Sequence, residues 1–169
     1  TEGMDEEVYK TISLKDLYAR TGIQKAIFNT VYQLMAVKKK HPEYLEQAET
    51  LLHVPDYFHF LLTGEKTCEY TEATTGQLVC PTTKDWDYEL IDMLGYPKKI
   101  FQKLIMPGTS IGHLTDKIKE EVGFDLEVVA PATHDTGSAV LAVPANDDDF
   151  IYISSGTWSL MGIERKEAD

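Results

Sequence analysis

The sequence predicts an α/β fold whose first part is rich in helices. Three observations support this prediction: apolar residues recur at helical spacing up to about residue 110, an apolar run follows at residues 126–133, and two strand-like runs close the chain. The run at 126–133, LEVVAPAT, is continuous, which is typical of a strand buried on both faces of a parallel or mixed sheet. A chain of 169 residues, 43% of them hydrophobic, is long enough to bury a core.

The first two helices are predicted from caps and spacing. Ser13 is placed to cap a helix over 13–22, with Asp16 at the third position of a capping box and Gly22 as its terminator. A second helix is predicted over 23–40, because its apolar residues have helical spacing and its last turn carries lysines that suit the helix dipole. These apolar residues are Ile27, Val31, Leu34 and Met35.

Prolines and glycines divide the next part of the chain. Pro42 and Pro55 each begin a predicted helix, PEYLEQAETLLH and PDYFHFLLTG, and Gly64 ends the second one. The threonine-rich segment 64–81 has no clean period, which favours a loop with room for a short helix. Helical spacing resumes in DWDYELIDMLGYP and PKKIFQKLIMPG.

The last part of the chain alternates between strand and helix patterns. After LEVVAPAT, the segment HDTGSAVLAVP predicts a small-residue helix that Asp135 or Thr136 caps and Pro144 stops. The acidic residues 145–149 are then expected to link two lobes, residues 1–145 and residues 146–169. FIYISS and WSLMGIE follow as two strands that begin the second lobe.

Asp135 is the leading candidate for a chemical role. A carboxylate that follows a buried strand and precedes a helix lies at the carboxyl edge of a sheet, where open α/β folds bind their ligands. There it could accept the proton of a substrate hydroxyl, as aspartates do in phosphoryl transfer. Helix capping explains the same residue and, on residue types alone, is the favoured alternative.

The turn between the last two strands is a candidate anion site. Gly156 lets the backbone approach a ligand closely, and exposed turn N–H groups beside the Thr157 hydroxyl form a concavity that suits phosphate. A hairpin turn made of small residues is the alternative reading.

Other polar residues have plainer readings. The five histidines, His41, His53, His59, His113 and His134, show no metal-ligand spacing, and no third ligand is expected near His53 and His59. All but His134 are interpreted as structural or surface residues. The two cysteines, Cys68 and Cys80, fit neither a disulfide framework nor a zinc site. No residue of the chain is therefore predicted to bind a metal.

Three further segments each have two readings. Asp147, Asp148 and Asp149 could bind a divalent ion, but a solvated acidic turn is favoured. Phe28 and Asn29 could line a sugar pocket, or Phe28 could simply join the core from an amphipathic helix. The segment Tyr70–Gln77 could edge a site for a polyol, since hydroxyl and amide groups suit such a ligand, or it could be loop structure alone.

The net charge of −12 argues against nucleic acid or an anionic membrane surface as a partner, because either would repel the chain. Thiols without a pairing motif, and the lack of any signal-peptide pattern, favour a reducing cytoplasm. The chain begins at Thr1, so we expect it to be part of a longer protein.

Six segments together resemble the FGGY carbohydrate kinases. They are TGIQKAIFNTVYQL, VPDYFHFLLTG, LLTGEKTCEYTEATTGQLV, MPGTSIGHLT, ATHDTGSAVLAVP and YISSGTWSLMGIE, of which the last two are the most specific. The resemblance implies an actin-like, ribonuclease-H-like fold of two lobes that close over ATP and a sugar. It also implies transfer of the γ-phosphate to a primary hydroxyl of a ketose, with L-rhamnulose as the first expectation, and with Mg²⁺ on the phosphates.

The resemblance also implies roles for single residues. Asp135 would be the catalytic base, His134 and Thr136 would flank it at the sugar, and Gly156 and Thr157 would contact the ATP phosphates. Where the family often has Ala after the His-Asp-Thr stretch, this sequence has Gly137, a change between small residues.

The sequence departs from the family pattern at both ends. Members begin with a strand and a glycine-containing aspartate loop for phosphate and metal, and carry a glycine-rich adenine motif further on; neither occurs in this sequence. We therefore expect the middle of the enzyme, with very weak ATP binding and no turnover by this chain alone. The alternatives are another kinase of the family, for fuculose, xylulose or glycerol, and a non-catalytic sugar-binding module of the same fold.

Overall fold

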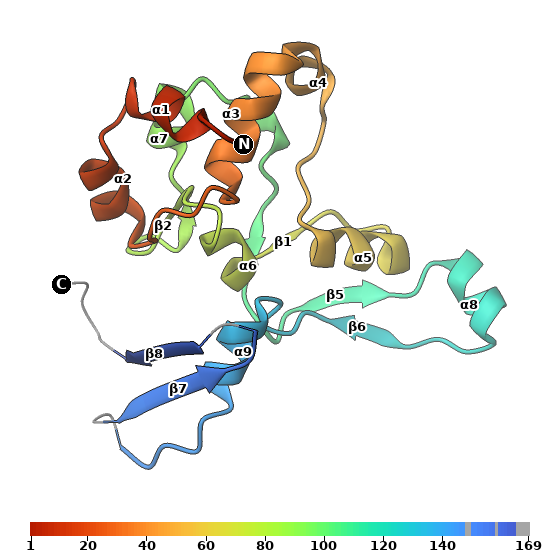
Figure 1. The fold of residues 1–169 in the computed structure, drawn as a ribbon. Helices are drawn as coiled ribbons and strands as arrows, with labels where there is room; N and C mark the ends of the chain where they lie inside the picture. Colours follow the sequence, from red (N-terminus) through yellow and green to blue (C-terminus); the bar gives the residue numbers. More distant parts are fainter. Residues whose placement is uncertain (148–149, 158, 165–169) are drawn as a thin grey trace.

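The computed structural model describes residues 1–147, 150–157 and 159–164, and Figure 1 shows their arrangement. The helices are α1 (Met4–Tyr9), α2 (Leu14–Thr21), α3 (Thr30–Lys40), α4 (Pro42–Gln47), α5 (Val54–Thr63), α6 (Tyr70–Thr74), α7 (Tyr88–Met93), α8 (Asp116–Val122) and α9 (Asp135–Leu141), with a 3₁₀ turn at Lys98–Ile100. The strands are β1 (Cys68–Glu69), β2 (Val79–Cys80), β3 (Asp85–Trp86), β4 (Leu104–Ile105), β5 (Ser110–His113), β6 (Glu127–Val129), β7 (Ile151–Ser155) and β8 (Ser159–Ile163).

The described strands form four separate pairs. β1 pairs with β4 in parallel, whereas β2–β3, β5–β6 and β7–β8 are antiparallel. Most of the helices gather around one core, and the β5–β6 ribbon and the β7–β8 hairpin extend from it (Figure 1). Within the described residues, no helix has the length and apolar character needed to cross a membrane.

The helix-rich first part forms as its caps and spacing predict. In α2 the Ser13 hydroxyl accepts the N–H of Asp16 at 3.1 Å, and Gly22 ends the helix in the left-handed region at φ 69°. Gly64 ends α5 in the same way, at φ 79°. The paired strands β7 and β8 also confirm the predicted hairpin.

The predicted helix over 23–40 begins later than expected, at Thr30. Asn29 explains the difference, because its side chain accepts the N–H of Ala26 and donates to the carbonyl of Thr75, both at 2.6 Å. These bonds hold the preceding residues as a loop against α6. The helix that Pro42 begins is also shorter than predicted and ends at Gln47.

Two sequence predictions in the second half are wrong. The segment PKKIFQKLIMPG forms a 3₁₀ turn and then β4 instead of a helix, because the backbone beyond Phe101 pairs in parallel with β1. The strand in LEVVAPAT is not buried on both faces: Val128 is buried, but Glu127 and Val129 are exposed. It pairs with β5 alone among the described strands, and the pair is antiparallel, so only one face is covered.

The main core lies between the helices. Leu17 of α2, Tyr32 of α3 and Leu90 of α7 are fully buried in one cluster, where each such side chain stabilises the fold by about 1.5–3 kcal/mol. A smaller cluster around Ile111 and Val128 lies beneath the β5–β6 ribbon. The first part of the chain therefore supplies the rigid support for the segments that follow it.

A partly buried ion pair links α2 to the start of α7. The Arg20 guanidinium donates two hydrogen bonds to Asp87, at 2.7 and 2.8 Å, and the same carboxylate caps α7 through the N–H of Leu90. The bonds from Arg20 lower the pKa of Asp87 below its ordinary value, although burial opposes them. The carboxylate therefore stabilises the fold in its charged form.

We expect Asp87→Asn to lower the free energy of unfolding by about 1–3 kcal/mol at pH 7, because Asn keeps the cap but leaves the exposed Glu89 as the counter-charge of Arg20. A depressed pKa contributes stability above the ordinary value of about 3.9, and that contribution is lost as the pH falls further. The difference between parent and variant should therefore shrink below about pH 4. Urea unfolding at several pH values measures it. The control Glu89→Gln removes an exposed partner of Arg20 and should change stability by less than about 0.5 kcal/mol.

Candidate active site

The segment that leads into α9 is held by a buried carboxylate. Glu69, at the end of β1, accepts hydrogen bonds from the N–H and the hydroxyl of Thr133, at 3.1 and 2.8 Å. The Thr71 hydroxyl, itself bound to Glu69, accepts the N–H of His134 at 3.2 Å. Residues 133 and 134 are thereby fixed against α6 just before the helix begins.

Asp135 is the first residue of α9, and its side chain is 97% exposed. The prediction that Asp135 or Thr136 caps this helix is wrong: the cap position belongs to His134, whose side chain makes no cap bond. The Asp135 carboxylate instead accepts the N–H of its neighbour Thr136 at 2.6 Å. Its position leaves the carboxylate facing solvent at the start of a helix, where it can meet a ligand.

The β7–β8 hairpin brings its turn to the same place. Asp135 and Thr136 line a hollow of about 290 Å³ together with four residues of the hairpin and its turn. These four are Ser154, Gly156, Thr157 and Leu160. A Cβ atom built on Gly156 would meet nothing within 4 Å, so this side of the turn is open. The two predicted groups, separated by about twenty residues of sequence, thus face one hollow.

His134 faces a different cavity, of about 450 Å³, on the other side of the start of α9. Its wall includes Phe28, Thr30, Gln33, His53, Glu72 and Thr75. The imidazole Nε2 of His134 lies 4.0 Å from the Asp135 carboxylate. His134, at the cap position of α9, and Asp135, its first residue, therefore line two different spaces.

Two carboxylates near His134, those of Glu69 and Glu72, have pKa values shifted in opposite directions. Burial alone would raise the pKa of Glu69, but hydrogen bonds from Thr71 and Thr133 outweigh it and hold the pKa below its ordinary value. Burial raises the pKa of Glu72. His53 and His134 lower it, but they offset only part of the effect of burial. Glu69 is thus a charged anchor, whereas Glu72 is a cavity wall group that is more easily protonated.

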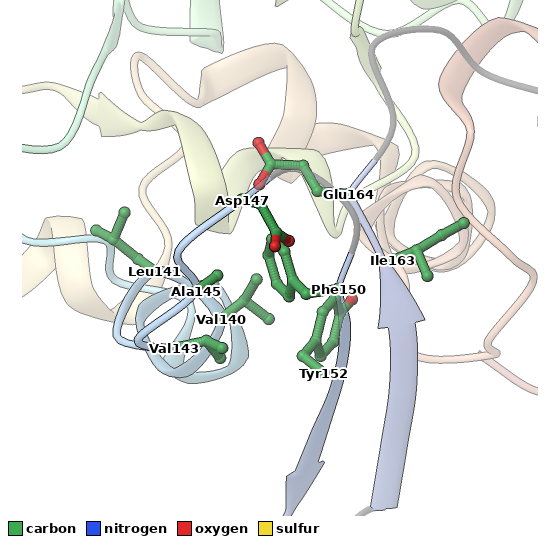
Figure 2. A pocket seen from close by; sticks show the side chains of 10 residues that line it. Val140, Leu141, Val143, Ala145, Asp147, Phe150, Tyr152, Ile163 and Glu164 are labelled. Atoms are coloured by element: carbon green, nitrogen blue, oxygen red, sulfur yellow. The ribbon is translucent and has the colours of Figure 1, made fainter.

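The largest of these hollows, about 660 Å³, contains neither predicted group. Figure 2 shows Val140 and Val143 on its α9 side and Phe150 and Tyr152 on its β7 side. Its wall is mainly apolar in this region, with carboxylates at Asp147 and Glu164.

Of the remaining candidates from the sequence, some line the His134 cavity and others are buried in the fold. Phe28, with 64% of its surface exposed, lines the His134 cavity, whereas Asn29 is buried and holds the loop. In the segment Tyr70–Gln77, Glu72 and Thr75 line that cavity, but Gln77 is fully buried in the core. Of the acidic turn, Asp148 and Asp149 lie outside the described residues.

Two sets of polar residues were missed by reasoning from the sequence. In the sequence, Glu69 belongs to a threonine-rich segment that predicts a loop. The one signal of its role is its place in CEYTEATT, where a carboxylate precedes several hydroxyl side chains that can donate to it. The expectation that no third ligand atom lies near His53 is also wrong. Donor atoms of His53, Asp56 and Cys68 all lie within 4.8 Å of one another, because β1 contacts the start of α5 and the segment before it through the bonds Glu69 N–H to Asp56 and Cys68 Sγ to the Leu51 carbonyl.

Comparison with known proteins gives a consistent set of relatives. A family model described as the N-terminal domain of the FGGY family of carbohydrate kinases matches residues 1–142. Over 164 residues the chain is 56% identical to a protein named rhamnulokinase from Halalkalibacterium halodurans, covering 97% of this chain and 35% of that protein. A rhamnulokinase from Bacteroides thetaiotaomicron is 43% identical over 165 residues, covering 97% and 34%. The chain thus spans about a third of the length of these relatives.

Solved structures show the same architecture. The chain superposes on a xylulose kinase from Lactobacillus acidophilus with a TM-score of 0.80 and 22% identity, covering 95% of this chain and 33% of that one. A carbohydrate kinase from Novosphingobium aromaticivorans gives a TM-score of 0.76 at 27% identity, covering 95% and 36%. The predicted α/β fold, as part of a sugar kinase, is confirmed.

Proposed function

The chain belongs to the FGGY family of carbohydrate kinases, and from this premise we propose that the full-length protein transfers the γ-phosphate of ATP to a primary hydroxyl of L-rhamnulose. The relatives named rhamnulokinase support this choice of ketose. One structural observation carries the proposal: the Asp135 carboxylate and the Gly156–Thr157 turn line a single hollow. A base and a phosphate cradle must adjoin in any enzyme that phosphorylates a hydroxyl.

In this proposal Asp135 is the general base. Its exposed carboxylate accepts the proton of the sugar hydroxyl as the oxygen attacks the γ-phosphorus. The bond from that phosphorus to the bridging oxygen breaks, and ADP leaves with the bond electrons. Thr136 and Thr157 supply hydroxyl donors on the two sides of the hollow, and Gly156 leaves room for the phosphate to approach the backbone.

The ketose itself is assigned to the His134 cavity. Gln33, Glu72 and Thr75 offer donors and acceptors for sugar hydroxyls, and Phe28 offers an apolar surface for a methyl group. His134 stands at the end of this cavity beside Asp135, so a sugar bound there can extend one hydroxyl toward the base.

ATP and Mg²⁺ complete the proposed reaction. The polar side chains of the Asp135 hollow offer only oxygen donors, which is the donor type that Mg²⁺ prefers. Ser154 and Thr157 are the hydroxyls placed to hold the ion beside the phosphates. When bound, Mg²⁺ neutralises the negative charge of the phosphates.

The proposal includes a two-lobed organisation and a cytoplasmic setting. Residues 1–145 would belong to the first lobe and residues 146–169 would open the second. The family match over 1–142 supports this division, as do the exposed apolar side chains of the hairpin, which need a partner surface. They include Ile151, Ile153 and Met161, which are 69–75% exposed. The net charge of −12 supports small-molecule partners over nucleic acid or an anionic membrane.

A coupled assay of ADP release tests the proposal on the full-length protein. The panel is L-rhamnulose, L-fuculose, D-xylulose and glycerol, each with Mg-ATP. We expect the highest kcat/KM for L-rhamnulose. A preference for another substrate would move the protein to another branch of the family. Absence of turnover with all four, despite measurable sugar binding, would favour a non-catalytic sugar-binding module.

Substitutions in the turn test the phosphate assignment. Gly156→Val meets no described neighbour, so the fold should tolerate it, but its side chain would obstruct the nucleotide. We expect the KM for ATP to rise about 10-fold or more, and about 3- to 10-fold for Thr157→Ala, which loses one hydrogen bond to a charged group. The KM for the sugar should stay within about twofold, since the His134 cavity is unchanged.

The control for these two variants is Ser159→Ala. Its hydroxyl contacts Ser155 across the hairpin at 3.2 Å but does not line the hollow, so its kinetics should match the parent. Parental kinetics for both turn variants would show that the turn serves the hairpin alone.

A further inference from the structure

A buried group of three potential ligands lies where α5 begins, beside β1. His53 precedes the first residue of α5, Asp56 lies in its first turn, and Cys68 begins β1. One donor atom from each residue lies within 4.8 Å of the other two. Asp56 and Cys68 are completely buried, and the His53 side chain is 12% exposed. Ionisable groups this deep need specific partners.

The hydrogen bonds of this group leave two of the three converging atoms without a partner, whereas Cys68 Sγ donates to the carbonyl of Leu51 at 3.5 Å. Asp56 uses one carboxylate oxygen, Oδ1, to accept the N–H of Glu69 at 2.8 Å, and His53 Nε2 lies 3.4 Å from the Thr30 hydroxyl. The other two atoms, Asp56 Oδ2 and His53 Nδ1, have no hydrogen-bond partner among the described residues. They lie 3.5 Å apart and face each other. Buried polar atoms without a partner are rare and call for an explanation.

We propose that His53 Nδ1, Asp56 Oδ2 and Cys68 Sγ bind one zinc ion. Nitrogen, oxygen and sulfur donors together are typical of zinc, whereas Mg²⁺ and Ca²⁺ select oxygen alone. The outer contacts are those of a metal site, in which each ligating side chain is oriented by a hydrogen bond from its other polar atom. The backbone of Glu69 does this for Asp56, and the Thr30 hydroxyl does it for His53.

Binding replaces the proton of the Cys68 thiol. The Cys68 thiol is completely buried and donates to the carbonyl of Leu51 at 3.5 Å, so the ion must displace the thiol proton and this bond. A zinc-bound thiol is deprotonated, so one proton leaves to solvent for each ion bound. Because His53 also lines the 450 Å³ cavity, the ion has a route to the buried atoms from that side.

A bound ion would stabilise the elements on which the proposed active site is built, and it would not take part in the reaction. It joins the start of α5 to β1, and the next residue of β1 is Glu69, which holds Thr133 ahead of α9. His59 Nδ1 lies 4.0 Å from Asp56 Oδ1 and is unpartnered among the described residues. The inference is independent of the sugar that the protein phosphorylates.

Cobalt and zinc titrations of the full-length protein, after removal of metals with a chelator, test the site. Co²⁺ should bind with one equivalent and give a thiolate-to-cobalt charge-transfer band. The band should disappear in Cys68→Ser and weaken strongly in His53→Gln. It should persist in Cys80→Ser, which removes the other, more exposed cysteine of this chain. Zn²⁺ at 100 times its Kd should raise the Tm of the parent by about 2–4 °C, given a full-length protein about three times as long as this chain.

Three results would overturn the proposal. The first is a parent protein without the charge-transfer band and without a Zn²⁺-dependent rise in Tm. The second is a band of parental intensity in Cys68→Ser. The third is zinc binding that releases no proton, measured by calorimetry in two buffers with different ionisation enthalpies. The first and third use the parent alone, so they decide the matter even where a variant fails to fold.

Discussion

The Asp135→Asn variant of the full-length protein should keep its fold and lose turnover by about 10²- to 10⁴-fold, the usual contribution of a positioned general base. Asn has the size of Asp and can still accept the N–H of Thr136, but it cannot take a proton at neutral pH. The Asp135 side chain is 97% exposed and caps no helix, so little stability depends on its charge. The KM for the sugar should change less than kcat, since an amide still hydrogen-bonds a hydroxyl.

Steady-state kinetics and a thermal melt on the same preparations measure both effects. Asp116→Asn is the matched control: Asp116 is also the first residue of an exposed helix, α8, and lines neither hollow of the proposed site. It should leave both kcat and Tm at parental values. Near-parental turnover in Asp135→Asn would eliminate Asp135 as the base. A collapsed Tm would instead make its role structural.

Local rules predicted the parts of the fold that depend on local contacts. Ser13 and Gly22 bound α2 because cap bonds join residues three or four positions apart. The last two strands were predictable because alternation and a short turn suffice for a hairpin. Asp135, Gly156 and Thr157 could be predicted as candidates in the same way, from their neighbours in the sequence. The hollow that they share forms because α9 packs beside β7.

The failures occur where a distant segment decides the local structure. The helix predicted to begin at residue 23 is delayed by Asn29, whose amide reaches Thr75. The helical pattern at 97–108 gives way to β4 because Leu104 pairs in parallel with Cys68, which precedes it by 36 positions. Contacts of this range leave no periodic signal in the sequence, so spacing alone predicts the wrong element.

The same limit applies to the site. Glu69 and Thr133 are 64 positions apart, and Cys68 lies near His53 only in the folded chain. A carboxylate in a threonine-rich loop resembles many surface residues until the fold buries it. Glu69 is nevertheless the residue on which the placement of His134 and Asp135 most depends, and its removal is the sharper test of how the site is built.

Glu69→Gln should destabilise the full-length protein by about 2–4 kcal/mol. The Glu69 carboxylate is fully buried and accepts bonds from Thr71, Glu72 and Thr133, all of which donate. An amide of the same size presents an N–H group to these donors and removes the charge that they stabilise. Because the pKa of Glu69 is held low, its contribution exists above its ordinary value of about 4.3 and is lost as the pH falls. The acid side of the stability curve should therefore be flatter in the variant.

Turnover in Glu69→Gln should also fall, by about 10- to 100-fold, because the segment that positions Asp135 loses its anchor and small displacements of a base are costly. Kinetics measured well below the Tm of the variant separate this effect from unfolding. Glu65→Gln, on the exposed loop before β1, is the control and should match the parent. Thr133→Ala should lower kcat in the parent but add little in the Glu69→Gln background, since both changes break the same link. Fully additive losses would show that Glu69 stabilises the fold without positioning the base.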